Sequence, residues 1–193
     1  MKFFFGLLAF IAAVVVVVLL VVSLFRGFNT GNTANPITTT YSLNEKTSID
    51  TIARYTVSGP IVADENFRQV RITVSKNART IEVLKGYSAK VEKTSTLTNS
   101  EVAYSAFLGA LRAAEFSNKR ENVTSDPATT CVTGNKFFYE LALASEKKVD
   151  TWTSNCTFKD GTFAGNPRGT AQIFRAQIPN YREITNGVNL ASL

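Results

Sequence analysis

Few residues of this sequence have the type and spacing that catalysis requires. The chain contains no histidine, which excludes His-based triads, Cys–His pairs and the commonest general base. One pattern, Ser145-Glu146-Lys147-Lys148, has the S-x-x-K spacing of acyl enzymes in which a lysine deprotonates the serine. These residues fall at the tip of a predicted hairpin, where water keeps a lysine charged, so we interpret them as a turn. We predict no catalytic residue.

Motifs for metals and cofactors are also missing from the sequence. Cys131 and Cys156 are the only cysteines, and neither belongs to a closely spaced pair of the kind that binds zinc. The acidic residues are scattered, Asp64-Glu65 is their only adjacent pair, and no Asp-x-Asp-x-Asp calcium loop occurs. A glycine-rich phosphate loop is absent as well. The sequence therefore predicts neither a metal nor a cofactor.

The two cysteines instead suit a structural disulfide. Cys131 lies just before one strand of a predicted hairpin and Cys156 ends the other strand, so the pair can meet at the hairpin base. Such a bridge stabilises a fold by about 3–4 kcal/mol in the chain-entropy model. A redox role is the alternative, but the spacing is far from C-x-x-C. A disulfide in turn favours an exported domain, because disulfides persist in oxidising compartments.

Charge is the last candidate signal for function. The chain has 21 Lys and Arg against 15 Asp and Glu, a formal net charge of +6. Basic residues gather in a predicted β-meander. Four of them are a candidate face for an anionic partner such as envelope polymer, lipid head groups or DNA: Arg71, Lys85, Lys90 and Lys93. Acidic residues interleave with these cations, so a solvated face is the simpler interpretation, and we predict no specific nucleic-acid binding.

The elements that must position these residues follow an apolar N-terminal run. Residues 3–25 carry no charge, and as a helix they span about 34 Å, enough for a hydrocarbon core of about 30 Å. A cleaved secretory signal is the alternative, but its apolar core is only about 7–15 residues long and ends at a small-x-small site. We predict a transmembrane anchor over residues 1–26 that contacts the bilayer through residues 3–25. We expect a single-pass protein of the cell membrane, with a cytoplasmic N-terminus and an extracytoplasmic C-terminal domain.

A linker and one domain are predicted to follow the anchor. Residues 27–46 are rich in Gly, Asn and Thr, a composition that cannot bury a core and is typical of a flexible tether. Residues 47–193 are enough for one extracytoplasmic domain with its own core. We expect the folded part to begin between Thr47 and Thr51.

Strand periodicity dominates the first part of this domain. A strand is predicted over Thr51–Ser58. An antiparallel meander follows, and its apolar face is formed by Val70, Ile72, Val74, Ile81, Val83, Tyr87, Ala89 and Val91. A second hairpin over residues 136–156 is expected to contribute Trp152 as the largest core residue.

Two helices are predicted beside these strands. The first covers residues 99–116, is capped by Thr98 and Glu101, and presents an apolar stripe of Tyr104, Phe107, Leu108 and Leu111. The second begins at Pro167, and the tail after Tyr181 is expected to add a short strand or to fray. The order of three or four strands, a helix, two strands and a helix predicts an α+β fold, with an antiparallel sheet covered by helices on one face.

The layout also carries two resemblances. The order of elements, together with the stretch DTWTSNCTFKDGTFAGNPRGTAQIFRAQIPNY over residues 150–181, resembles small single-pass envelope-anchored proteins of bacteria, most of which have no assigned role. The hairpin–helix–hairpin–helix layout of residues 67–181 is similar to the emfourin-type inhibitors of thermolysin-like metalloproteases. That similarity implies a protease inhibitor that presents a rigid loop at residues 118–130 or 158–166. Emfourins carry a Gly-Gly turn where they meet the protease and this sequence has none, so no inhibitory residue is carried over.

Binding rather than catalysis is therefore the predicted function. The expected protein is a membrane-anchored, extracytoplasmic α+β domain that contacts an envelope polymer or a protein partner. A protease-inhibitor-like module is the first alternative, and an enzyme of unrecognised type is the second. A deep pocket with convergent polar groups would favour the enzyme, whereas an exposed apolar patch would favour a protein partner.

Overall fold

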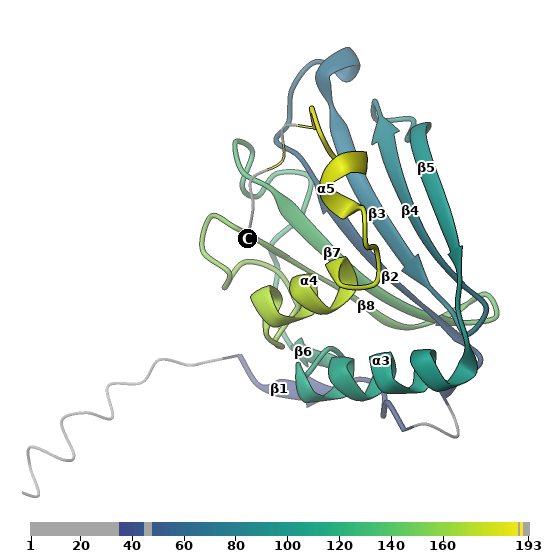
Figure 1. Cartoon of the computed structure of the whole chain (residues 1–193). Helices are drawn as coiled ribbons and strands as arrows, with labels where there is room; N and C mark the ends of the chain where they lie inside the picture. Colours follow the sequence, from purple (N-terminus) through teal and green to yellow (C-terminus); the bar gives the residue numbers. More distant parts are fainter. Residues whose placement is uncertain (1–34, 45–47, 189, 191–193) are drawn as a thin grey trace, which may run out of the picture. The chain divides into compact units, whose positions relative to one another are not determined.

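The main sheet has six antiparallel strands, in the order β5-β4-β3-β2-β7-β8 (Figure 1). It belongs to a computed structural model that describes residues 35–44, 48–188 and 190. The predicted meander is confirmed as β3, β4 and β5, and the predicted hairpin as β7 and β8. The strands are β2 (Thr51–Ser58), β3 (Arg68–Val74), β4 (Ala78–Lys85), β5 (Lys90–Thr98), β7 (Lys136–Leu143) and β8 (Glu146–Ser154).

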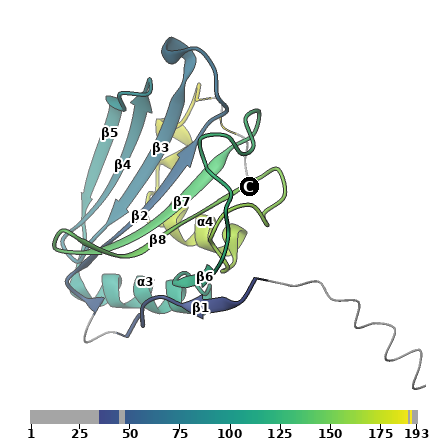
Figure 2. The same cartoon turned by 180° about the vertical axis from the view of Figure 1, so that it is seen from behind.

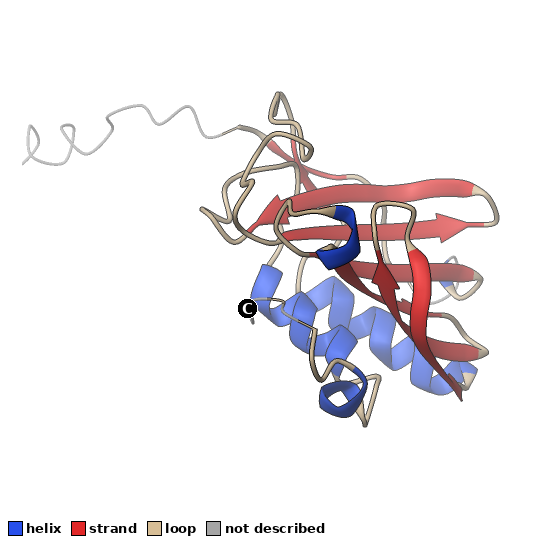
Figure 3. Cartoon of the chain, turned by 90° about the horizontal axis from the view of Figure 1, so that it is seen from above, coloured by secondary structure: helices blue, strands red, loops and turns tan. Residues whose placement is uncertain are grey.

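Helices cover one face of this sheet (Figure 3). They are α3 (Glu101–Ala113), α4 (Pro167–Arg175) and the single turn α5 (Tyr181–Ile184), and a 3-10 turn, η1 (Asp64–Asn66), precedes β3. Because side chains alternate along a strand, β2 turns every second residue toward the helices, and these residues are buried together with the predicted apolar stripe of α3. The predicted α+β class, with an antiparallel sheet and helices on one face, is confirmed.

The predicted anchor over residues 1–26 lies outside the described residues. Within residues 35–44, 48–188 and 190, no helix is long and apolar enough to cross a membrane. The anchor, the bilayer contact through residues 3–25 and the single-pass topology therefore stay predictions.

Part of the predicted linker is folded. β1 (Ile37–Thr39) pairs antiparallel with β6 (Asn118–Arg120), and Leu43 is buried in the core. Three residues are too few for a strand periodicity to show in the sequence. The expected start of the folded part, between Thr47 and Thr51, is therefore too late.

The sheet continues beyond β8 through residues 162–164. The N–H of Phe163 donates to the carbonyl of Trp152 in β8 (2.9 Å), and the N–H of Arg120 in β6 donates to the carbonyl of Thr162 (2.7 Å). Residues 162–164, β6 and β1 thus follow β8 in turn, and the small β1–β6 sheet lies near α3 (Figure 2). These segments cover the β8 edge at its end, around Trp152.

Trp152 is buried and is the largest of the buried hydrophobic residues, as predicted, but it lies outside the main core cluster. Val149 of β8 belongs to the core beneath the helices, and strand alternation places Trp152, three residues further on, on the opposite face. The loop at Gly161 covers it there. A Cβ atom at position 161 would lie 2.7 Å from the indole, and the backbone φ of +80° also favours glycine.

The start of β5 departs from the predicted apolar face. Tyr87 and Ala89 lie in the turn before this strand, and the side chains of Tyr87 and Val91 are exposed. The pairing of β4 with β5 shifts between Val83 and Leu84, which inserts an extra residue on β5. A bulge of this kind breaks the strand alternation on which the prediction depended.

The helix termini also differ from the prediction in detail. The N-cap of α3 is Ser100, whose hydroxyl accepts a hydrogen bond from the N–H of Ala103 (3.2 Å). Thr98 cannot cap the helix, because it is still paired within β5. The start of α4 at Pro167 is confirmed, with Asn166 as its N-cap, and the tail forms α5 instead of a strand.

Candidate functional site

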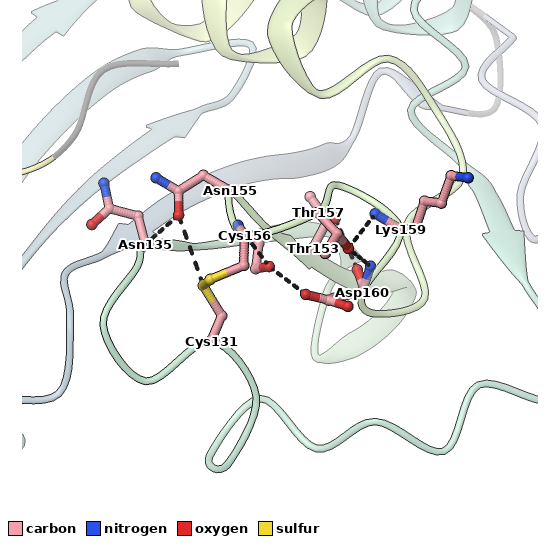
Figure 4. The surroundings of a disulfide bond; sticks show 9 residues. Cys131, Asn135, Thr153, Asn155, Cys156, Thr157, Lys159 and Asp160 are labelled. Carbon is pink, nitrogen blue, oxygen red and sulfur yellow. Dashed lines mark hydrogen bonds between the residues drawn. A yellow bond between two sulfur atoms is a disulfide. The ribbon is translucent and has the colours of Figure 1, made fainter.

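The predicted disulfide is present at the base of the β7–β8 hairpin. Cys131 and Cys156 are joined, with their Cα atoms 5.8 Å apart (Figure 4). The amide oxygen of Asn155 accepts a hydrogen bond from the N–H of Asn135 (2.8 Å), which ties the two sides of the hairpin base together. A Cβ atom at Gly134 would overlap the disulfide sulfurs, so glycine is required there. With both cysteines bonded to each other, this region is a structural clasp.

The S-x-x-K pattern lies in and beside the two-residue turn between β7 and β8. Lys148 forms an ion pair with Glu146 at 2.6 Å, and no hydrogen bond joins Lys148 to Ser145 among the described residues. The neighbouring Lys147 pairs with Glu140 at 2.7 Å. These contacts agree with a turn held by ion pairs rather than with a nucleophile beside a base.

The four residues of the candidate anionic-partner face do not share one surface. Arg71 lies on the face away from the helices, 3.7 Å from the carboxylate of Glu82. Lys93 lies on the helix-covered face, where its ammonium donates to a carbonyl of α5 and to one just after it (3.3 and 3.1 Å). Lys85 and Lys90 face each other across the β4–β5 turn. Anion binding by Lys85 and Lys90 stays a prediction, but a single face of four cations is not formed.

The two segments that a protease inhibitor would present belong partly to the sheet. Within residues 118–130 the first three form β6, and within residues 158–166 the side chain of Phe163 is fully buried. The two segments bond to each other, since the N–H of Ala164 donates to the carbonyl of Asn118 (3.1 Å). The paired residues 118–120 and 162–164 cannot extend into a protease cleft, and for the remaining residues of the two segments an inhibitory loop stays a prediction. No observation in the described part of the chain favours the inhibitor.

An open cleft of about 940 Å³ lies beside α4, α5 and the chain that follows α5. Ligand sites commonly measure about 300–1,000 Å³, so the cleft has room for a small molecule. Much of its lining is apolar, from Val57, Ile178, Pro179, Val188 and Leu190. Its charged and aromatic lining is Arg175, Tyr181, Arg182 and Glu183. The arginines outnumber the single carboxylate, so the cleft favours an anion.

Arg175 is the most unusual of these side chains. Its guanidinium lies over the ring of Tyr181, 5.3 Å from the ring centroid. Its Nε is buried without a hydrogen-bond partner, and the guanidinium forms no ion pair with any described carboxylate. Buried polar groups in native proteins nearly always have a partner. Arg175 therefore has one unused donor, its Nε, in the wall of the cleft.

Tyr55 lies near this arginine, in the centre of the core. Its ring stacks on that of Phe174 in α4, with centroids 5.4 Å apart, and its hydroxyl has no partner among the described residues. Burial raises the pKa of Tyr55 far above its ordinary value, and the positive charge of Arg175 opposes that rise. The hydroxyl is therefore neutral at physiological pH and close enough to Arg175 for the two to interact.

Sequence reasoning does not identify this cleft. Arg175 is a cation in the last turn of a helix, where it interacts favourably with the helix dipole. Its position in the sequence therefore does not distinguish it from other arginines. Tyr181 falls in the tail that was expected to form a strand or to fray. A usable signal is Pro179, which follows the helix and forces a change of chain direction between Arg175 and Tyr181.

Comparison with known proteins adds no assignment, because no family model, curated protein or solved structure matches this chain. The resemblances to bacterial envelope proteins and to emfourins therefore stay predictions. Any functional proposal depends on the side chains of the cleft and on their chemistry.

Proposed function

We propose that this protein is a membrane-anchored, extracytoplasmic binding domain whose α4–α5 cleft holds an apolar ligand with a carboxylate group. The observation that carries the proposal is Arg175, whose Nε is buried without a partner in the wall of that cleft. A guanidinium presents its donors in a planar fork that matches the two oxygens of a carboxylate.

The rest of the cleft lining suits the apolar body of such a ligand. Pro179, Val188 and Leu190 offer apolar surface, and the Tyr181 ring already packs on the guanidinium. An arginine held against an aromatic ring loses little conformational freedom when it binds, because its plane is fixed beforehand. Apolar contact would then supply much of the affinity, and Arg175 would supply the selectivity for the charge.

The disulfide supports the proposed location. A structural disulfide between Cys131 and Cys156 suits an oxidising compartment outside the cytoplasm. The uncharged run of residues 3–25 supports attachment to the membrane, because it is long enough to cross a bilayer. Intact-mass measurement after alkylation without reductant tests both points. A full-length mass without alkyl groups is expected, and a shortened chain or two alkylated thiols would contradict the proposal.

Ligand binding is tested with two soluble probes of the same shape, 4-phenylbutyrate and its uncharged amide, 4-phenylbutyramide. Saturation-transfer NMR on the full chain in lipid nanodiscs measures each affinity, with empty nanodiscs as the blank. We expect the carboxylate to bind more tightly than the amide. Arg175→Gln is expected to weaken carboxylate binding about ten-fold or more, the usual effect of losing a hydrogen bond to a charged group.

Arg168→Gln is the matched control, because Arg168 lies on the same helix and also sits over an aromatic ring, Phe158, at 5.7 Å. It does not line the cleft. This variant is expected to bind both probes like the original chain. Equal binding of carboxylate and amide, or equal losses in the two arginine variants, would refute the assignment of Arg175 as the anion site.

A further inference from the structure

Among the described residues, β5 is the edge strand of the main sheet that has no backbone partner along the whole of its outer side. The opposite edge, β8, is followed by residues 162–164, β6 and β1. β5 pairs with β4 on one side, and no described residue forms a backbone hydrogen bond with its other side (Figures 1 and 2). An edge strand of nine residues, Lys90–Thr98, therefore presents a row of unpaired N–H and C=O groups to its surroundings.

Only one end of this edge carries the usual protection against pairing. The first part of β5 contains Lys90, Glu92 and Lys93, and the bulge opposite Val83 and Leu84 twists it. Charges and bulges of this kind keep natural edge strands from pairing with other chains. The second part, Thr94-Ser95-Thr96-Leu97-Thr98, is uncharged, regular and made largely of residues that favour strands. This half of the edge therefore lacks the charges and the bulge that prevent pairing with another strand.

The charges of the β5 side chains, and the face of the sheet on which each lies, decide the register in which a second copy of β5 could pair with the first. Residues that oppose each other in an antiparallel pair lie on the same face, so a two-fold axis between two copies must pass through a residue. An axis at Lys93 opposes two lysines, which is unfavourable. An axis at Thr94 brings the bulge at Glu92 into the ladder, and an axis at Thr96 pairs Lys93 with Asn99, which lies outside the strand.

An axis at Ser95 opposes no two lysines, keeps residues 93–97 of both copies within the strand, and leaves the bulge at Glu92 at the end of the ladder, opposite Thr98. It pairs Thr94 of one copy with Thr96 of the other, and cross-strand threonine pairs stabilise a sheet. It also places the aliphatic stem of Lys93 beside Leu97, and both of these residues lie on the helix-covered face. No two like charges oppose each other in this register.

We propose that β5 pairs with β5 of a second copy of this chain, antiparallel around a two-fold axis at Ser95. The two main sheets would then join edge to edge, and the interface would be self-complementary, as a closed dimer requires. The α4–α5 cleft has no lining residue on β5, so this inference is independent of the proposed ligand site.

A second copy fits this edge better than an unrelated peptide. Proteins that capture foreign strands at a sheet edge select them with pockets beside the edge that accept alternate side chains. None of the three described pockets is lined by a β5 residue. The selectivity must then come from the register itself, and β5 supplies a strand that matches its own pattern.

Disulfide trapping of the full chain tests both the dimer and its register. The two native cysteines are bonded to each other, so a single introduced cysteine carries the free thiol. Two cysteines directly opposite each other on an antiparallel pair lie about 5 Å apart at Cα, within reach of a disulfide. Ser95→Cys is therefore expected to give a covalent dimer on mild oxidation, seen on a non-reducing gel.

Leu97→Cys is the matched control, two residues along the same strand and on the same face. Its copy would lie four residues away along the pair, about 13 Å, which is beyond disulfide reach. This variant alone is expected to stay monomeric on the gel, whereas a mixture with Lys93→Cys chains is expected to cross-link. Equal cross-linking of Ser95→Cys and Leu97→Cys, or none in either, would overturn the proposal.

A second variant covers the case in which an introduced cysteine disturbs the fold. Ser95→Lys places two lysines on the proposed axis and leaves the remaining sequence unchanged. Light scattering of the full chain in detergent is expected to give a dimer mass for the original chain and loss of that dimer for Ser95→Lys. A monomeric original chain, or a Ser95→Lys chain that remains dimeric, would also overturn the proposal.

Discussion

Replacing Tyr55 with phenylalanine is expected to stabilise this protein. Tyr55 is 1% exposed, and its ring packs against three others, Phe174, Tyr139 and Phe137, with centroids 5.4, 5.6 and 6.4 Å away. The hydroxyl is buried without a partner among the described residues. An unsatisfied buried hydroxyl costs about 1–3 kcal/mol. Phenylalanine keeps the ring and removes that cost, so we expect the free energy of unfolding to rise by about 1–2 kcal/mol.

Tyr104 provides a matched control with the opposite sign. It is as deeply buried, but its hydroxyl donates to the carbonyl of Thr51 (2.8 Å) and contacts the Thr51 hydroxyl at 3.1 Å. Tyr104→Phe removes the donor and leaves buried oxygens with one partner fewer. We expect this variant to lose about 1–2 kcal/mol in the free energy of unfolding.

Urea unfolding of the full chain in nanodiscs, followed by the fluorescence of Trp152, measures both changes. For a domain of about 150 residues, 1 kcal/mol corresponds to a shift in Tm of about 2–4 °C, so thermal unfolding is an independent check. Opposite signs for the two substitutions are the expected result. If Tyr55→Phe destabilises the protein as much as Tyr104→Phe, the Tyr55 hydroxyl has a bonding partner such as buried water, and the reasoning is refuted.

Two further substitutions test the electrostatics of the sheet. Burial alone would raise the pKa of Glu140, but hydrogen bonds from Lys147 and Arg54 outweigh it and lower that pKa. Glu140→Gln should therefore cost about 1 kcal/mol or less at pH 7, with the difference vanishing in acid as the native carboxylate becomes protonated; a difference that persists at low pH would contradict this. Burial lowers the pKa of Lys136, which is 4% exposed and has no ion pair with a described residue. Lys136→Met should stabilise the fold by roughly 1–2 kcal/mol at pH 7, and the gain should shrink toward pH 10.5, where the unfolded lysine also loses its proton. Urea titrations between pH 7 and 10 that show no gain would refute it.

The sequence predicts the elements whose periodicity is long enough to read. The eight residues of β2 alternate cleanly, and the Tyr104-to-Leu111 stripe of α3 repeats with helical spacing, so both are found. The three-residue strands β1 and β6 carry no such pattern. They form because β6 finds backbone partners on both sides, β1 on one side and residues 162–164 on the other. Trp152 is buried on the face away from the main core cluster, because the loop at Gly161 covers it there, and that loop shows no periodicity in the sequence.

The cleft could not be predicted as a ligand site, because the argument for it depends on a side-chain atom that has no hydrogen-bond partner. The sequence predicts a helix that begins at Pro167 and a strand over Thr51–Ser58, and both are confirmed. It does not show that the Arg175 Nε lacks a partner, because that depends on where every nearby acceptor lies in three dimensions. In contrast, the disulfide could be predicted, because the pairing of the two strands of a hairpin brings cysteines at its two ends close together.

The two long helices differ in how their buried polar atoms are satisfied, and this difference supports the proposal of a ligand site beside α4. Tyr104 on α3 has its hydroxyl bonded to β2. On α4, the hydroxyl of Thr170 and the Nε of Arg175 are buried without partners, and so is the hydroxyl of Tyr55, whose ring packs against this helix. A buried polar atom without a hydrogen-bond partner lowers the stability of the fold, so we expect it to be retained where function requires it. A helix that served only to cover the sheet would gain stability from apolar residues at these positions. Of these atoms, the Nε of Arg175 belongs to a residue that lines the cleft, and it is the one that supports the proposed ligand site.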